Sequence, residues 1–193
     1  IYGGNKEDEE ARIDNEIAKL RPILGESMYS EQDDSLQECI GRLLARTGKT
    51  VSAAESCTGG TISALLTSVP GSSDYYLGSV TSYANSVKTG VLGVDPEIIQ
   101  KFGAVSSECV AQMAEGVRKL TGSDFSVATS GIAGPGGGSE EKPVGLVWIG
   151  VSSQLGTETL KLTFKGDRKR NMERFAASAL DTLRRKLINE LNY

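Results

Sequence analysis

Residues 55–60, with the sequence Glu-Ser-Cys-Thr-Gly-Gly, carry side chains that could do chemistry. They offer a hydroxyl at Ser56 and a thiol at Cys57, followed by two glycines that let a ligand approach the backbone closely. A short β-compatible run precedes them, and an apolar helical pattern follows. A helix starting here would present N–H groups and partial positive charge, which suit a phosphate or a developing oxyanion. The alternative is an ordinary strand–helix turn capped by Thr58.

The absence of histidine limits the chemistry that such a site can use. None of the 193 residues is His, which excludes Ser-His-Asp and Cys-His catalysis and every His-based zinc site. The three cysteines, Cys39, Cys57 and Cys109, match neither a metal-ligand spacing nor a disulfide framework. Acid–base chemistry therefore falls to Lys, Tyr, Asp, Glu or a bound water, and we expect no metal and no cofactor.

Composition bounds the location and the partners of the chain. A hydrophobic content of 38% over 193 residues allows one globular domain and an appendage. The net charge of −4 disfavours a bulk polyanion such as duplex DNA as a partner. No apolar run approaches the ~20 residues that span a bilayer, and no signal-peptide pattern opens the chain. We expect a reduced, cytoplasmic protein that binds no membrane, and a first residue other than Met suggests a piece of a longer protein.

Residues 81–88, Thr-Ser-Tyr-Ala-Asn-Ser-Val-Lys, end one predicted strand and open a helix. Tyr83 and Lys88 would then lie within about a turn and a half of each other. A lysine that is desolvated beside a serine can act as its base, and a tyrosine can relay or anchor the proton. The alternative for Lys88 is a solvated surface residue.

Two other segments have features of an anion site. Residues 130–138 follow a strand and hold five glycines in nine positions, so their backbone could form an anion nest. We favour this over a flexible connector, while Lys142 either reaches a phosphate or is solvated. Arg168 opens the last helix with two further cations, which oppose the helix macrodipole and so favour an anionic ligand nearby. The alternative is a surface arginine paired with a carboxylate.

One apparent nucleotide motif is not accepted. Residues 46–50, Arg-Thr-Gly-Lys-Thr, end like a Walker A loop, but Leu43 stands where the first glycine is needed. The segment also precedes a strand, whereas a phosphate-binding loop must follow one. We interpret Gly48 as a helix stop followed by a turn.

The order of the elements indicates an α/β fold. A helical segment over 7–20 ends near Pro22, a polar linker follows over 25–34, and another helix begins near Ser35. Strands and helices then alternate, and the last two strands are close enough to form a hairpin. We predict a three-layer α/β/α sandwich with a mixed, mostly parallel five-stranded sheet. Its strands are expected near 50–55, 78–83, 124–130, 144–152 and 157–164, and its helices near 59–68, 85–92, 95–101, 107–120 and 168–190.

Five blocks of sequence carry a family resemblance: residues 54–60, 81–85 with Lys88, 103–106, 130–135 and 141–145. Together and in this order they resemble the C-terminal domain of the competence/damage-inducible protein CinA, over roughly residues 31–193. The resemblance implies an α/β/α fold and frequent homodimers. Full-length relatives carry an N-terminal domain similar to molybdopterin-binding proteins. We therefore expect 1–30 to be a helical linker, the tail of that missing domain, and 31–193 to be the amidohydrolase domain.

The resemblance also implies an activity, that of a nicotinamide-nucleotide amidase in nucleotide salvage. Such an enzyme hydrolyses nicotinamide mononucleotide to nicotinate mononucleotide and ammonia without a metal. The family's proposed nucleophile maps to Ser56, with Tyr83 and Lys88 as the other catalytic positions. The substrate-binding positions that we expect are Cys57, Thr58, Gly59, Gly60, Asn85, Ser130, Gly131, Ile132, Ala133, Gly134, Lys142 and Arg168.

Two alternatives stay open. Cys57 is a rival nucleophile, since Glu55, Lys88 and Cys57 could imitate a Glu-Lys-Cys amidase. Alternation along the strand would send Ser56 and Cys57 to opposite faces, so that only one meets the ligand. The second alternative is a non-catalytic nucleotide-binding or competence-related interaction domain, for which nucleic acid is a disfavoured partner.

Overall fold

A five-stranded mixed sheet forms the centre of the protein, which we describe for residues 5–191 from a computed structural model. The strand order is β2-β1-β3-β4-β5. Strand β1 pairs in parallel with both β2 and β3, whereas β4 is antiparallel to β3 and to β5, so β4 alone runs against the others. The bounds are Val51–Glu55 for β1, Tyr76–Thr81 for β2, Phe125–Gly131 for β3, Leu146–Ser153 for β4 and Gly156–Thr163 for β5.

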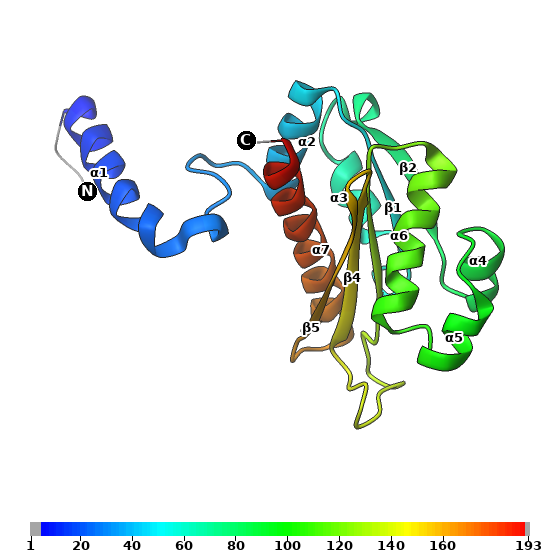
Figure 1. The fold of residues 1–193 in the computed structure, drawn as a ribbon. Coiled ribbons are helices and arrows are strands. Elements are labelled where there is room, and N and C mark those ends of the chain that lie inside the picture. Colours follow the sequence, from blue (N-terminus) through cyan, green and yellow to red (C-terminus); the bar gives the residue numbers. More distant parts are fainter. Residues whose placement is uncertain (1–4, 192–193) are drawn as a thin grey trace.

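Helices cover both faces of this sheet, which confirms the predicted three layers (Figure 1). One layer contains α2 (Leu36–Thr47), α3 (Thr61–Thr67) and α7 (Arg168–Leu191). The other contains α4 (Asn85–Gly90), α5 (Pro96–Phe102) and α6 (Ser107–Thr121). A short 3-10 turn, η2 (Ser72–Asp74), precedes β2.

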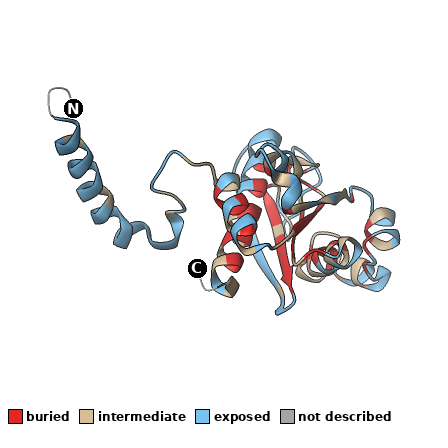
Figure 2. Cartoon of the chain, turned by 90° about the horizontal axis from the view of Figure 1, so that it is seen from above, coloured by how far each residue is buried: buried red, intermediate tan, exposed pale blue. Residues whose placement is uncertain are grey.

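Each helical layer has its own apolar core. An apolar stripe along α7, which includes Phe175, Leu183 and Leu187, packs with α2, α3 and the sheet. On the other face, Val110 and Met113 of α6 pack against Ala54 and Ala128 of the sheet. Buried residues accordingly concentrate in the strands and on the sheet-facing sides of the helices (Figure 2). Burial on both faces explains why the central strands are almost continuously apolar or small.

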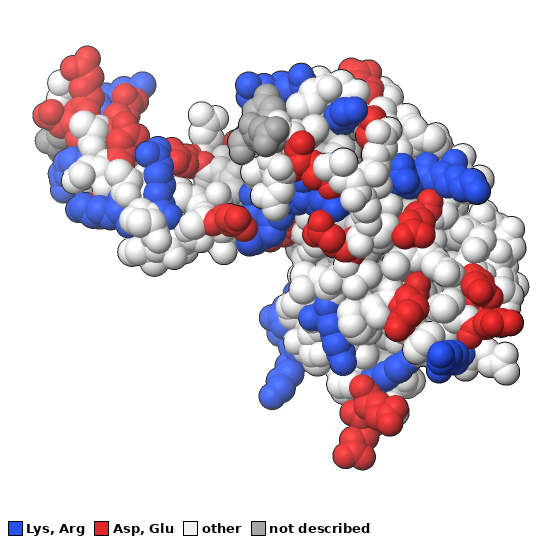
Figure 3. Space-filling model, in the orientation of Figure 1, with Lys and Arg blue, Asp and Glu red and all other residues white. Residues whose placement is uncertain are grey.

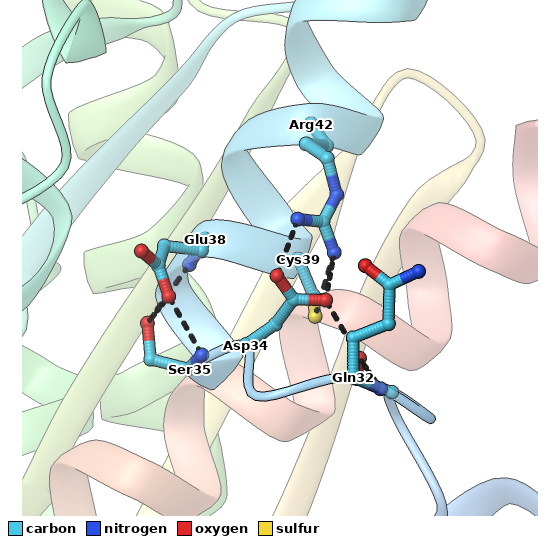
Figure 4. Close-up of polar contacts among 7 residues, drawn as sticks. Gln32, Asp34, Ser35, Glu38, Cys39 and Arg42 are labelled. Carbon is cyan, nitrogen blue, oxygen red and sulfur yellow. Dashed lines mark hydrogen bonds and ion pairs between the residues drawn. The ribbon is translucent and has the colours of Figure 1, made fainter. Parts of the chain in front are cut away.

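Local signals fix the ends of α2. The Ser35 hydroxyl and the Glu38 carboxylate form a reciprocal capping box, and Arg42 binds the Asp34 carboxylate through two nitrogens (Figure 4). At the other end, Gly48 adopts the left-handed conformation, with φ of 62°. The helix-stop interpretation of Gly48 is therefore confirmed.

Helix α1 (Lys6–Leu24) stands apart from the sheet (Figures 1 and 2) and buries none of its residues. It runs past Pro22 to Leu24, with Gly25 at its C-cap, and so ends slightly later than predicted. Part of the expected linker forms a 3-10 turn, η1 (Gly25–Ser27). Two side chains of α7 contact this turn. Arg184 and Arg185 each place a nitrogen 2.6 Å from an oxygen of Glu26.

Most other boundaries agree with the predictions to within a few residues. Strand β2 begins and ends two residues before the predicted 78–83, which leaves Ser82 and Tyr83 beyond its carboxyl end. Asp167 caps α7, accepting a hydrogen bond from the Arg170 amide at 2.9 Å. No helix within residues 5–191 is both long and apolar enough to cross a membrane.

Candidate active site

The predicted nucleophile, Ser56, follows β1, the strand whose two successors along the chain lie on opposite sides of it in the sheet. Strand β1 is central among the parallel strands, with its successor β2 on one side and β3 on the other. In open α/β sheets such a switch point opens a crevice at the carboxyl ends of the strands, where ligands bind. Ser56 directly follows β1, Tyr83 lies just beyond β2, and Gly131 ends β3. The topology thus gathers three of the predicted segments at one edge.

Lys88 of α4 contacts Ser56 directly. Its Nζ lies 3.1 Å from the Ser56 Oγ and donates to the Ser82 carbonyl at 2.6 Å. The side chain is only 2% exposed, so the solvated-surface alternative is wrong. Burial lowers the pKa of Lys88, an effect that the Cys109 and Cys57 thiols partly oppose. A lysine with a lowered pKa beside a serine hydroxyl can act as the base in a site that has no histidine.

The start of α3 is closed by the protein's own carboxylate, contrary to our prediction of an open anion site. Glu55 is fully buried, and its Oε2 accepts from the amides of Gly60 at 2.9 Å and Ile62 at 3.1 Å. Its Oε1 accepts from the Ser63 amide at 2.9 Å and from the Ser63 hydroxyl at 2.6 Å. The helix start therefore already holds a negative charge.

The same contacts correct two roles that we assigned within the turn. Thr58 is not the helix cap, since its hydroxyl lies 2.8 Å from the Thr129 hydroxyl and Gly60 occupies the cap position. The Gly59 amide donates to the Ser56 carbonyl at 3.2 Å. Among residues 5–191, the amides of Cys57 and Thr58 make no hydrogen bond to another residue, so they are the remaining candidate oxyanion donors.

Cys57 belongs to the core and not to the Lys88 side. It is 6% exposed, within the apolar cluster beneath α2, α3 and α7. Burial raises the pKa of its thiol to about 12. Ser56 and Cys57 thus lie on opposite sides, as alternation predicts. With the Glu55 carboxylate bound to α3, the Glu-Lys-Cys arrangement that we considered is not formed.

Arg168, at the start of α7, joins two of the predicted binding segments. Its Nη2 lies 3.1 Å from the Tyr83 hydroxyl, and its Nη1 donates to the Gly134 carbonyl at 2.9 Å. Its partners are therefore a phenol and a carbonyl, and not the carboxylate of the alternative interpretation. Tyr83 is 64% exposed, next to the exposed first turn of α4 that begins at Asn85. The phenol is linked to Arg168 rather than to Lys88.

In the segment that ends β3 and begins the following loop, several groups expected to bind an anion make hydrogen bonds within the protein instead. Ser130 is buried and its hydroxyl donates to the Ala104 carbonyl at 2.7 Å, so this side chain does not face a ligand as predicted. The Ile132 amide donates to the Leu146 carbonyl at 2.8 Å, which removes one predicted nest donor. Gly131 pairs with Val147 as the last residue of β3. Only the part of the loop beyond Gly134 is exposed.

Two side chains that anchor this loop have roles that sequence reasoning did not find. Lys142 is half-buried, and its Nζ donates to the Phe102 carbonyl at the end of α5, at 2.6 Å. Asn171 is fully buried and its Nδ2 donates to the carbonyls of Ala133 and Gly166, both at 3.0 Å. A lone Asn in the first turns of a helix gives no signal of such a contact.

The described residues contain no group of three or more Cys, Asp or Glu side chains that could hold a metal ion. The contacts at this edge of the sheet offer the chemistry of a hydroxyl beside a desolvated amine.

Comparison with known proteins places this geometry in a family. The model of the CinA C-terminal domain matches residues 33–187. The chain belongs to the CinA C-terminal domain family. CinA-like proteins of Desulfosudis oleivorans and Endomicrobium trichonymphae are 53% and 47% identical to it, over 88% and 96% of this chain. It spans 41% and 44% of the lengths of those two relatives, so their whole-protein properties are not established for it.

Solved CinA structures share the fold. The competence/damage inducible protein CihA of Agrobacterium tumefaciens has a TM-score of 0.75 and 39% identity, covering 77% of this chain and 91% of its own. The competence damage-inducible protein A (ComA) of Klebsiella pneumoniae has a TM-score of 0.76 and 35% identity, covering 79% and 94%. These names refer to competence and damage, and not to a reaction.

We expect Cys57 to resist thiol reagents in the native protein. It is buried and its raised pKa keeps the thiol protonated near neutral pH; Cys39 and Cys109 are also buried, with raised pKa values. Iodoacetamide at pH 8 should leave Cys57 unmodified by mass spectrometry, whereas all three thiols should react in guanidinium chloride. Rapid native alkylation of Cys57 would contradict the burial and restore it as a nucleophile.

Proposed function

We propose that this CinA domain hydrolyses the carboxamide of nicotinamide mononucleotide to nicotinate mononucleotide and ammonia, with Ser56 as nucleophile. The observation that carries the proposal is the 3.1 Å contact between the Ser56 hydroxyl and the buried Lys88 amine. The family resemblance supplies the substrate, and the geometry supplies a nucleophile, a base and oxyanion donors of the kinds that amide hydrolysis needs.

Lys88 acts first as a general base. Its neutral amine takes the Ser56 proton as Oγ attacks the carboxamide carbon, and the new O⁻ receives hydrogen bonds from the Cys57 and Thr58 amides. The Lys88 ammonium then returns that proton to the leaving nitrogen, so that ammonia departs and an ester to Ser56 remains. Water, deprotonated by Lys88, attacks the ester, and the proton passes back to the Ser56 oxygen. The sum is one amide and one water giving one acid and one ammonia.

Binding of an anionic nucleotide needs local positive charge, since the net charge of the chain is −4. Arg168 supplies it with a planar fork of donors suited to phosphate. Its contact with the Tyr83 hydroxyl links it to the segment that follows β2. Figure 3 shows lysine and arginine side chains at the lower end of the domain, together with a group of acidic side chains at its lowest tip. We assign the phosphate to Arg168.

Replacement of the nucleophile tests the proposal. Ser56→Ala should lower kcat/KM for ammonia release from nicotinamide mononucleotide by roughly 10³-fold or more, because no other group can form the acyl intermediate. Ser86→Ala, an exposed serine on the same helix as Lys88, should leave the rate unchanged. Activity should persist in excess EDTA. An unimpaired Ser56→Ala enzyme removes Ser56 as nucleophile, and loss of activity with EDTA points to a metal.

The pH dependence follows from the environment of Lys88. Because burial lowers the Lys88 pKa from 10.5, the neutral amine is present at lower pH than in an ordinary lysine. We expect kcat to rise with pH through this lowered pKa and to level off before pH 10.5. Lys88→Arg, whose side chain remains protonated, should lose most activity and show no such rise. A kcat profile of the parent that is flat from pH 5 to 10 would exclude Lys88 as the base.

The assignment of the phosphate to Arg168 can be tested separately from the assignment of the nucleophile. Arg168→Ala should raise KM for the mononucleotide about tenfold or more, because a charge-assisted bidentate contact is lost. Nicotinamide riboside should be a poor substrate for the parent enzyme and should be indifferent to the substitution. Arg170→Ala is the matched control, since its guanidinium lies 3.8 Å from the Asp167 carboxylate on an exposed surface. Equal losses on both substrates would instead assign Arg168 to the fold or to the chemistry.

A further inference from the structure

We propose that Glu55 is the positioning residue of the Ser56–Lys88 pair, holding the nucleophile through its side chain and the base through its main chain. This inference rests on the proposed function, and it gives a role to the only carboxylate that adjoins Ser56 in sequence. Glu55 does not touch the reacting atoms in this assignment; it acts through the groups that do.

The side chain of Glu55 fixes the turn that carries Ser56. Between the end of β1 and the start of α3, the chain is held at one end by the Ser56 amide, which donates to the Thr129 carbonyl at 3.1 Å. The other end is held by the carboxylate of Glu55, which accepts from the amides of Gly60 and Ser63, both at 2.9 Å. Ser56 and its candidate oxyanion donors lie between these two anchors. Their geometry therefore depends on a carboxylate that is completely buried.

The main chain of Glu55 fixes Lys88. The Glu55 carbonyl accepts from the Ser82 amide at 2.7 Å, and the Ser82 carbonyl accepts from the Lys88 Nζ at 2.6 Å. Two hydrogen bonds therefore connect Glu55 to the amine that contacts the Ser56 hydroxyl. A displacement of Glu55 moves the nucleophile and the base together, and small displacements of reacting groups reduce rates strongly.

An ordinary helix cap would not produce this connection. A capping side chain normally comes from the residue directly before the helix and binds an amide two or three residues later. Here Gly60 occupies the cap position without a side chain, and the carboxylate comes from the last residue of β1, eight positions before Ser63. The contact thus ties a strand to a helix across the turn between them. It also leaves Glu55 without a hydrogen bond to Lys88 among the described residues, so a role as base is not supported.

Glu55→Gln tests the role because glutamine keeps the shape but turns one oxygen into a donor that faces amide donors. We expect faster hydrogen exchange at the amides of Gly60, Ile62 and Ser63, with no change in the central strands. We expect kcat for the mononucleotide to fall roughly tenfold and KM to stay within about twofold, since Arg168 is not disturbed. Ser79→Ala is the matched control: the Ser79 hydroxyl lies 2.8 Å from that of Ser63 but does not contact Glu55.

Each result decides for or against the role. Faster exchange with unchanged kcat would reduce Glu55 to a structural cap and overturn the proposal, as would unchanged exchange. If Glu55→Gln does not fold, Ser63→Ala removes one of the four bonds to the carboxylate and should give a smaller fall in kcat at constant KM. An unchanged kcat in Ser63→Ala would also overturn the proposal.

A second readout separates this proposal from the proposed function. If the parent protein does not hydrolyse the mononucleotide, the proposed function fails, and the labelling rate of Ser56 by a fluorophosphonate replaces kcat. Slower labelling in Glu55→Gln than in the parent would still support the positioning role. Equal labelling, or no labelling of the parent, would overturn it.

Discussion

The burial of one lysine amine against one serine hydroxyl is the constraint on which the rest of the site depends. Removing an ammonium group from water is costly, and a buried lysine usually responds by losing its proton. Around Lys88 the groups that shift its pKa besides burial are the thiols of Cys57 and Cys109, and no carboxylate is among them. The fold therefore makes the neutral amine more accessible than in an exposed lysine, and it places that amine near two oxygens, those of Ser82 and Ser56.

The alternation of side chains along β1 and just beyond it gives the adjacent residues Ser56 and Cys57 different roles, one in the candidate site and one in the core. Because the chain at the end of β1 keeps the alternation of a strand, Ser56 turns toward Lys88 and α4 while Cys57 enters the core beneath α2, α3 and α7. The intrinsically stronger nucleophile is thus placed where its pKa is raised to about 12. Reactivity in this segment is decided by which side of the sheet a residue faces, and not by its side-chain type alone.

Features that depend on apolar periodicity and on the positions of strand ends could be predicted from the sequence. Hydrogen bonds between side chains and distant parts of the chain could not. The α7 stripe and the three layers follow from patterns of apolar residues, and the meeting of Ser56 with Lys88 follows from parallel strands ending at one edge. The contacts of Lys142 with Phe102 and of Ser130 with Ala104 span 40 and 26 residues, and no local spacing encodes them. Of these partners, Ala104 lies in the 103–106 block that carries part of the family resemblance.

The capping of α3 by Glu55 also decides how an anionic substrate can be held. A helix start with free amides would have attracted a phosphate through its dipole, but this one already accommodates a buried carboxylate, which would repel another anion. The start of α7 has the opposite character, since Arg168, Lys169 and Arg170 place positive charge where the macrodipole disfavours it. Asp167 offsets part of that cost by binding the Arg170 amide, while Arg168 extends to Tyr83 and Gly134 at the edge of the site. With the nearest dipole occupied, the guanidinium of Arg168 is the group to which the proposed function assigns the phosphate.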